Sequence, residues 1–330
     1  MIVAHHYVVN SGLIDVMKES PTSPNSIFFY LFGMWGKTGI NCFVMITGYF
    51  MCKSNITIRK FLKLVLEVIF YNIIIYLIFV SFGKSDFSFK ETFLCFLPIK
   101  SISDGFTSCF IAFYLAIPFL NILVRNMTKR QHQLLICFCL FVYTFIGTIP
   151  IFKLKMNYVS WFCVLYFIAS YIRFYYDTNI NKTQKMRGYS ALFIILSMIS
   201  VLMLLYMNKY NVYFFVSDSN KILALLTAIC SFMWFKDMKI EYSKWINTIA
   251  SSMFGVLLIH ANSDTMRHWL WKETLQNANH YGDNHYISYA LISVVTVFII
   301  CIIIDQIRIH IIEKNTFKQI DKILNKYSLN

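Results

Sequence analysis

Residues 286–307 read YISYALISVVTVFIICIIIDQI, and Asp305 is the one charged side chain among them. As an α-helix, this stretch would be about 33 Å long, which is enough to cross the roughly 30 Å hydrocarbon core of a bilayer. An uninterrupted apolar run of this length is typical of a membrane-spanning helix. The stretch therefore predicts that the chain crosses a membrane here.

The composition of the whole chain extends this prediction to the rest of the protein. Of its 330 residues, 58% are hydrophobic and 14% are charged, whereas soluble domains carry roughly 25% charged residues. A chain this apolar cannot bury its surface in one water-soluble core, so it belongs in a bilayer. We expect an all-α integral membrane protein.

Ten apolar segments follow one another along the chain, without an internal repeat or a linker long enough to separate domains. The aromatic-rich stretch 27–37 is expected at the membrane interface, and the polar stretch 11–26 is expected to be a loop. The sequence predicts one polytopic domain over 1–330, a bundle of about ten transmembrane helices. The predicted spans are 1–10, 38–52, 60–80, 105–124, 133–152, 158–176, 189–207, 220–235, 248–263 and 286–307.

The net charge of +14 does not indicate a nucleic-acid partner, because the basic residues form no single patch. They lie in short clusters between the apolar runs, and 19 of the 30 Lys and Arg residues fall in alternate connections. Cytoplasmic connections of membrane proteins carry such an excess. The pattern predicts a multi-pass protein with both termini in the cytoplasm.

Ionisable residues inside predicted spans are costly in a bilayer and are candidates for function. Glu67 follows Lys63 by one helical turn, which predicts a local ion pair between them. Arg173 and Asp305 lie near cytoplasmic span ends, where they can snorkel or pair with a neighbour. No spacing of Cys and His suits a metal, so none is expected.

Three histidines lie within the predicted spans. His5 and His6 are adjacent in the first segment, and neighbouring side chains on a helix point about 100° apart. One of them is therefore expected to face the bundle interior while the other supports it. A neutral imidazole acts as a general base or nucleophile near pH 7. The third histidine, His260, lies near the outer end of its span.

Four strings of residues are arranged along the chain in an order that resembles a known family. They are the His5–His6 pair, CFVMITGYF at 42–50, YLAIPFLN at 114–121, and MFG followed by LLIH at 253–260. Together they resemble the acyltransferase-3 family of membrane O-acyltransferases, which modify bacterial surface polysaccharides. That family has about ten helices, in agreement with the predicted span count.

The resemblance implies an O-acetyltransferase in the bacterial inner membrane. It would move an acetyl group from cytoplasmic acetyl-CoA to a hydroxyl of a polysaccharide or glycolipid on the outer side. His6 is implied as the main catalytic residue, with His5 as an auxiliary. The implied acceptor-binding candidates are His260, Asn262, Arg267 and Tyr49, and the implied motif glycines are Gly39 and Gly48.

The family also has an Arg or Lys eleven residues before the catalytic histidine, and from His6 that position falls before Met1. We therefore expect the first helix to be truncated and translation to start upstream. Two other classes of membrane protein remain as alternatives, namely a transporter such as a flippase and a polymerase-like glycan-assembly protein. Within the favoured class, the transferred group could be succinyl instead of acetyl.

Overall fold

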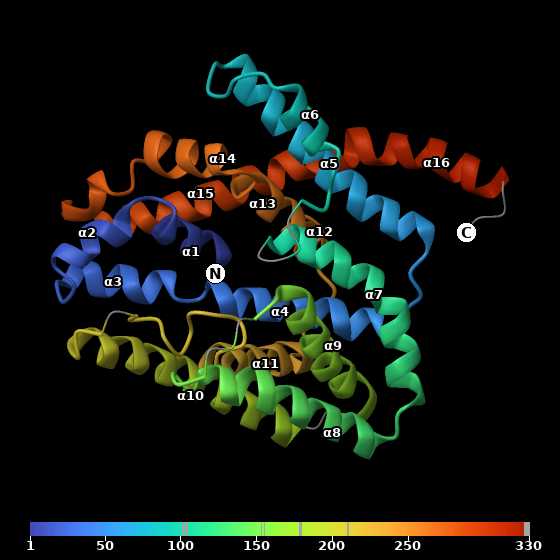
Figure 1. Ribbon diagram of the computed structural model, residues 1–330, viewed down its shortest axis with the longest axis horizontal. Coiled ribbons are helices and arrows are strands. Elements are labelled where there is room, and N and C mark those ends of the chain that lie inside the picture. The colour runs from blue at the N-terminus through green and yellow to red at the C-terminus, as the bar shows by residue number, and fades with distance from the viewer. Residues whose placement is uncertain are drawn as a thin grey trace. The chain divides into compact units, whose positions relative to one another are not determined.

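The computed structural model describes residues 1–100, 102, 105–152, 154, 156–177, 180–209 and 211–326. Within these ranges the chain is built from helices and connecting turns, and none of the described residues forms a strand (Figure 1). The prediction of an all-α protein is confirmed. The C-terminus at Asn330, which was predicted to be cytoplasmic, lies outside the described residues.

The described chain divides into two compact units. Unit 1 comprises Met1–His5, Ser20–Asn55 and Ser101–Ile240, and unit 2 comprises His6–Glu19, Ile56–Lys100 and Glu241–Asn330. Helix α1 (Ile2–Val9) therefore contributes residues to both units. That the chain acts as one domain stays a prediction.

Unit 1 is organised around α9 (Tyr158–Tyr175), which packs against three of its neighbours, α4, α7 and α8. The side chains of Trp161, Phe162 and Tyr166 on α9 are fully buried. The Asn157 side chain caps the N-terminus of α9 by accepting a hydrogen bond from the Val159 amide. The other helices of unit 1 are α3 (Pro24–Gly33), α4 (Gly36–Met51), α7 (Phe106–Asn126), α8 (Lys129–Leu140), the π-helical η1 (Phe141–Ile146), α10 (Ile180–Tyr206) and α11 (Ile222–Asp237).

Unit 2 is organised around α13 (Met253–His260), which packs against both α5 (Ile58–Ser81) and α15 (Tyr286–Ile307). The π-helical segment η4 (Arg308–Glu313) and α16 (Lys314–Lys326) continue α15 without a break. The remaining helices of unit 2 are α2 (Leu13–Glu19), α6 (Phe89–Cys95), α12 (Lys244–Ser251), α14 (Asp264–His268), the π-helical η2 (Trp269–Thr274) and the 3-10 helix η3 (Asn279–Gly282).

Within the described residues, five helices are long and apolar enough to cross a membrane. They coincide with five of the ten predicted spans, so a multi-pass count of about ten is not confirmed. Two other predicted spans correspond to α4 and α11, which have 16 residues each. The five helices are Ile58–Ser81, Phe106–Asn126, Tyr158–Tyr175, Asn181–Tyr206 and Tyr286–Lys322.

The structure also differs from the sequence-based expectation in two connections. The predicted single span 248–263 is broken at Ser252, whose backbone leaves the helical region between α12 and α13. The stretch 11–26, which was predicted to be a loop, contains the short helix α2. Leu13 and Met17 of α2 are fully buried, so tertiary packing stabilises a helix where the polar composition suggested none.

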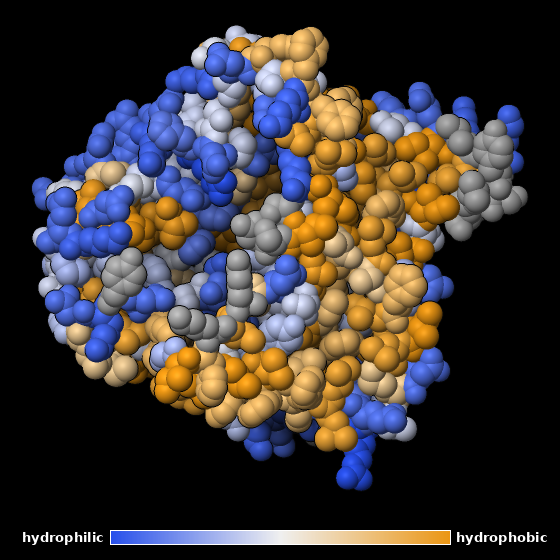
Figure 2. All heavy atoms as spheres, viewed as in Figure 1, coloured by the Kyte–Doolittle hydropathy of each residue, from blue (hydrophilic) through white to orange (hydrophobic). Residues whose placement is uncertain are grey.

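Apolar side chains are exposed over much of the molecular surface, as Figure 2 shows for one face. On α15, Ile292 is 65% exposed and Ile303 is 54% exposed. Exposed apolar surface of this extent is unfavourable in water and favourable against lipid tails. The surface therefore agrees with the long apolar helices in identifying a membrane protein.

Candidate functional site

Two histidines that are distant in the sequence meet in unit 2. His6 on α1 places its Nδ1 2.9 Å from Nε2 of His260, the last residue of α13. The two ring centroids are 5.0 Å apart. His260 is 1% exposed, and His6 is half-buried. The structure thus joins the predicted catalytic histidine to one of the predicted acceptor-binding residues.

The hydrogen bonds of His260 determine which ring nitrogens carry protons. Its Nδ1 lies at hydrogen-bond distance from the Val256 carbonyl, and because a carbonyl only accepts, this nitrogen must be the donor. In a neutral ring, Nε2 of His260 is then an acceptor, so Nδ1 of His6 must donate to it. The lone pair of a neutral His6 ring is therefore on its Nε2.

Aromatic side chains pack around this histidine pair. The ring of Trp271, on η2, contacts the rings of Tyr7 and His260 edge-on, at centroid distances of 5.9 and 6.3 Å. The Asn277 side-chain amide donates to the Tyr7 carbonyl at 3.0 Å. The side chains of Tyr7, Trp271 and Asn277 are fully buried. They fix the end of α1 next to His6, and sequence reasoning did not assign them this role.

A buried cluster of charged side chains lies at the junction of α15 and η4. Arg308, which is 5% exposed, contacts three carboxylates. Its Nε lies 2.8 Å from Asp305 Oδ1, its Nη2 3.1 Å from Glu67 Oε1, and its Nη1 2.9 Å from Glu313 Oε2. The Tyr71 hydroxyl also donates to Asp305 Oδ1, at 2.7 Å.

The predicted pair between Glu67 and Lys63 is wrong. Glu67 pairs with Arg308, whereas the Lys63 ammonium lies 2.7 Å from Glu313 Oε1. Glu67 is buried, and the Lys63 side chain is 47% exposed, so the arginine is the partner that shares its apolar surroundings. A buried carboxylate needs such a partner, because burying an isolated charge is far more costly than exposing one.

The charged cluster also supports α13 directly. Gly255 packs so closely against Asp305 that a Cβ on this glycine would lie 2.4 Å from the Asp305 carboxyl carbon. The next residue on α13 is Val256, whose carbonyl accepts the hydrogen bond from His260. The position of His260 therefore depends on the contact between Gly255 and Asp305.

His5 makes different contacts, within unit 1. Its Nδ1 donates to the Gly33 carbonyl at 2.6 Å, and its ring packs against Gly36, where a Cβ would lie 2.4 Å from the ring. A Cβ on Gly39 would lie 3.0 Å from the Ile2 side chain. These contacts hold the start of α1 against α4 and give His5 and Gly39 a packing role.

Asn262 and Arg267 are in unit 2, but their side chains bond to groups other than the histidine pair. The Asn262 amide donates to the Leu258 carbonyl at 3.1 Å and to Asn72 Oδ1 at 3.3 Å. Arg267 pairs with Asp264, three residues earlier, at 2.5 Å. Both residues follow His260 closely along the chain, and their acceptor-binding role stays a prediction.

Tyr49 and Gly48 are at the C-terminal end of α4 in unit 1. The Arg173 guanidinium donates to the Tyr49 hydroxyl at 2.8 Å and lies 4.6 Å from the centre of its ring. A Cβ on Gly48 would lie 3.1 Å from the Tyr166 Cα, so Gly48 permits close packing of α4 on α9. The role of Tyr49 in binding the acceptor also stays a prediction.

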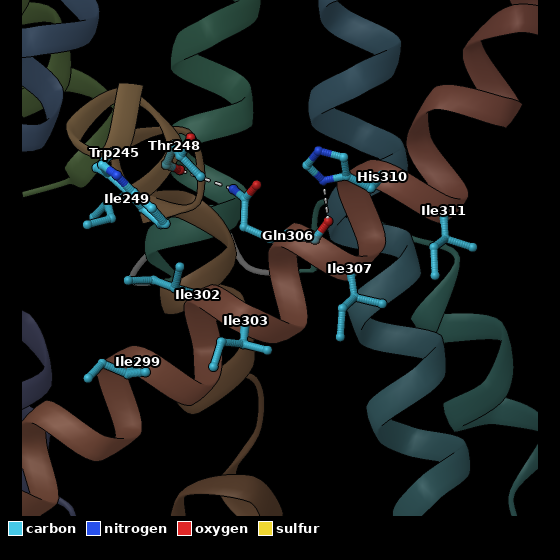
Figure 3. A pocket seen from close by; sticks show the side chains of 10 residues that line it. All are labelled: Trp245, Thr248, Ile249, Ile299, Ile302, Ile303, Gln306, Ile307, His310 and Ile311. Atoms are coloured by element: carbon cyan, nitrogen blue, oxygen red, sulfur yellow. Dashed lines mark hydrogen bonds between the residues drawn. The ribbon is translucent and has the colours of Figure 1, made fainter. Parts of the chain in front are cut away.

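A cavity of about 530 Å³ in unit 2 is lined mainly by isoleucines, four of them on α15, and includes none of the predicted site residues (Figure 3). On one side of it, the Gln306 amide donates to the Thr248 carbonyl at 3.0 Å and so links α15 to α12. His310 donates from Nδ1 to the Gln306 carbonyl at 2.8 Å. This histidine bonds to its own helix, and the cavity is an apolar surface without catalytic geometry.

Comparison with known proteins agrees with the resemblance noted in the sequence. No significant match was found among curated proteins or among solved structures. A family model, described as an acyltransferase domain, matches residues 1–306. This range includes His6, His260 and the charged cluster up to Asp305. Nearly the whole chain is therefore covered, and the protein belongs to the acyltransferase-3 family.

Proposed function

We propose that this membrane acyltransferase is an O-acetyltransferase, which moves an acetyl group from acetyl-CoA to a hydroxyl of a cell-surface or exported polysaccharide. The observation that carries the proposal is the chain of hydrogen bonds from His6 through His260 to the Val256 carbonyl. This chain directs the lone pair to Nε2 of His6. A positioned imidazole nitrogen of this kind is sufficient to activate a hydroxyl against a thioester.

In the proposed reaction, Nε2 of His6 removes the proton of the acceptor hydroxyl while the hydroxyl oxygen attacks the acetyl carbonyl carbon. A carbon–oxygen bond forms, the carbon–sulfur bond of the thioester breaks, and the sulfur leaves with its electron pair. The imidazolium of His6 then returns the proton to the CoA thiolate. His260 accepts a hydrogen bond from Nδ1 of His6 throughout, which stabilises the positive charge on the His6 ring.

The same nitrogen can instead attack the thioester itself and carry the acetyl group before the acceptor arrives. Either route uses Nε2 of His6 and the same support from His260. A covalent acetyl-histidine would accumulate without an acceptor, whereas the general-base route leaves no label on the protein. Exposure of the protein to acetyl-CoA carrying a radioactive acetyl group distinguishes the two routes.

The proposal places acetyl-CoA on the cytoplasmic side and the acceptor on the outer side of a bacterial inner membrane, with both chain ends in the cytoplasm. The alternation of basic connections along the chain supports this orientation. His5 acts as an auxiliary residue by holding α1 through Gly33. Asn262 and Arg267 follow His260 and are proposed to bind the acceptor at the outer side.

The test uses the full chain in proteoliposomes with acetyl-CoA or succinyl-CoA and a polysaccharide acceptor. We expect acetyl esters on the glycan from the unchanged protein and about 10²–10⁴-fold slower transfer by His6→Ala. Transfer of succinyl groups in preference to acetyl groups would change the donor and leave the reaction class intact. Transfer at an unchanged rate by a folded His6→Ala protein would refute the proposed chemistry.

A further inference from the structure

A long apolar groove of about 660 Å³ lies on unit 2 between α5 and α15. One wall is formed by Ile74 and Ile78 of α5, and the other by Ile304 and Ile307 of α15. The lining follows α5 from Phe70 to Phe82, the residue just past its end, which corresponds to about 18 Å along a helix. The groove is therefore long enough to hold an extended hydrocarbon chain over more than half the thickness of the bilayer core.

Cationic side chains lie at the two ends of this groove. At one end, Arg308 is buried, and three carboxylates already contact its guanidinium. At the other end, Lys84 has a 45% exposed side chain and pairs with Glu273 at 2.5 Å. The bond from Lys84 holds the pKa of the Glu273 carboxyl below its usual range, so Glu273 carries a negative charge at neutral pH. Lys84 is more exposed than Arg308 and contacts one carboxylate instead of three, so it is the cation that an anionic headgroup can reach.

The groove shares a wall with the helix that carries the candidate site. Ile259 lines the groove, and the next residue on α13 is His260. Met266 and Trp269, which follow on the same stretch of chain, also line it, and the Trp269 ring packs edge-on against Phe79. A molecule lying in the groove would therefore contact the segment that holds His260.

We propose that this groove binds the hydrocarbon chain of a lipid-linked acceptor, a glycan joined through a phosphate to a long apolar chain. The phosphate would lie at Lys84 and the chain along α5. Moving a hydrocarbon chain from lipid into an apolar groove releases little free energy, because lipid tails are already apolar. The contact between the phosphate and Lys84 therefore supplies the selectivity. Anchoring the acceptor beside α13 raises the local concentration of its hydroxyl groups near the histidine pair. This inference rests on the proposed function and specifies its acceptor.

The test is photo-crosslinking of the full chain in phosphatidylcholine nanodiscs. The probe is hexadecyl phosphate with a photoreactive diazirine in mid-chain, and the comparison probe is phosphatidylcholine with the same group in one acyl chain. Ile78→Trp fills the groove. Leu77→Trp is the matched control, because Leu77 is the neighbouring residue on α5, is 43% exposed against 47% for Ile78, and is not part of the groove lining.

We expect the phosphate probe to label groove-lining peptides of α5 and α15 several-fold more than the phosphatidylcholine probe does. Ile78→Trp should reduce this labelling about ten-fold, Leu77→Trp should leave it unchanged, and Lys84→Met should remove the preference for the phosphate probe. Equal labelling by both probes, or equal loss in both tryptophan variants, would show that only bulk lipid occupies the groove and would overturn the proposal.

The labelling requires no acetyl transfer, so it separates this inference from the proposed function. If the groove is labelled as expected while His6→Ala still transfers acetyl groups, the chemistry is wrong and the lipid site stands. If His6→Ala is inactive but the two probes label equally, the chemistry stands and the acceptor is not held through a lipid chain in this groove.

Discussion

Replacing Gly255 by alanine tests how closely the candidate site depends on the packing of α13 against α15. The added Cβ would lie 2.4 Å from both the carboxyl carbon and Oδ1 of Asp305, whereas ordinary contact begins at 3.4 Å. Asp305 cannot move aside easily, because it is fully buried and bonds to Tyr71 and Arg308. We therefore expect α13 to shift by about 1 Å, since overpacked helices relieve such clashes by moving their backbone.

A shift of this size would displace His260 relative to His6, whose hydrogen bond is 2.9 Å long in the native protein. A misplacement of about 1 Å in a catalytic arrangement can lower a rate about 10²-fold, and overpacking costs about 1–3 kcal/mol of stability. The assay is the release of CoA from acetyl-CoA by purified protein in nanodiscs in the presence of a polysaccharide acceptor, with the unfolding temperature measured in parallel. We expect Gly255→Ala to lose most of its activity while remaining folded.

The matched control is Gly282→Ala in the same unit, because a Cβ at Gly282 would meet no atom within 4 Å. This variant should keep the activity and the unfolding temperature of the unchanged protein. Wild-type activity in Gly255→Ala would refute the reasoning, because it would show that the position of α13 against Asp305 does not control the histidine pair.

Three further predictions concern the buried charges, the helix packing and the orientation in the membrane. Arg308→Met should lower the free energy of unfolding by about 3–5 kcal/mol in a denaturant titration, because it leaves buried carboxylates without their partner. Arg59→Met is the control, because it removes an exposed ion pair and should lower the free energy of unfolding by about 1 kcal/mol or less. Gly48→Leu should lower the unfolding temperature, because its side chain would meet the backbone of the adjacent helix; an unchanged temperature would contradict the close packing. A reporter active only in the periplasm should work in the connection 264–285 and remain silent after Asn330, and the reverse pattern would overturn the proposed orientation.

Much of the fold was predictable because membrane helices are determined by local composition. The spans that match 60–80 and 286–307 consist of long apolar runs, which need no tertiary information to be recognised. The break at Ser252 was not predictable, because the apolar residues continue on both sides of it. At the break, the Gln306 amide donates to the Ser252 hydroxyl at 2.7 Å, which is a tertiary contact that no local pattern shows.

The candidate site was predictable residue by residue but not as an arrangement. His6 and His260 stood out separately, because an imidazole in an apolar span is costly. Their hydrogen bond joins positions 254 residues apart, and no local pattern shows such a contact. For Glu67, the sequence predicted the local partner Lys63, whereas the actual partner is Arg308, because helical spacing is visible in a sequence and the packing of α5 against the end of α15 is not.

The central claim is that Nε2 of His6 performs the chemistry, with its proton state set by His260. The most direct measurement is the rate of acetyl transfer from acetyl-CoA to a polysaccharide acceptor by His6→Ala, His260→Ala and His5→Ala, each purified as a folded full-length protein. We expect His6→Ala to be about 10²–10⁴-fold slower than the unchanged protein. We expect His260→Ala to be about 10–100-fold slower, by analogy with the loss seen when the hydrogen-bond partner of a metal-bound imidazole is removed, and His5→Ala to be the least affected. Wild-type transfer by His6→Ala, or a loss confined to His5→Ala, would contradict the account.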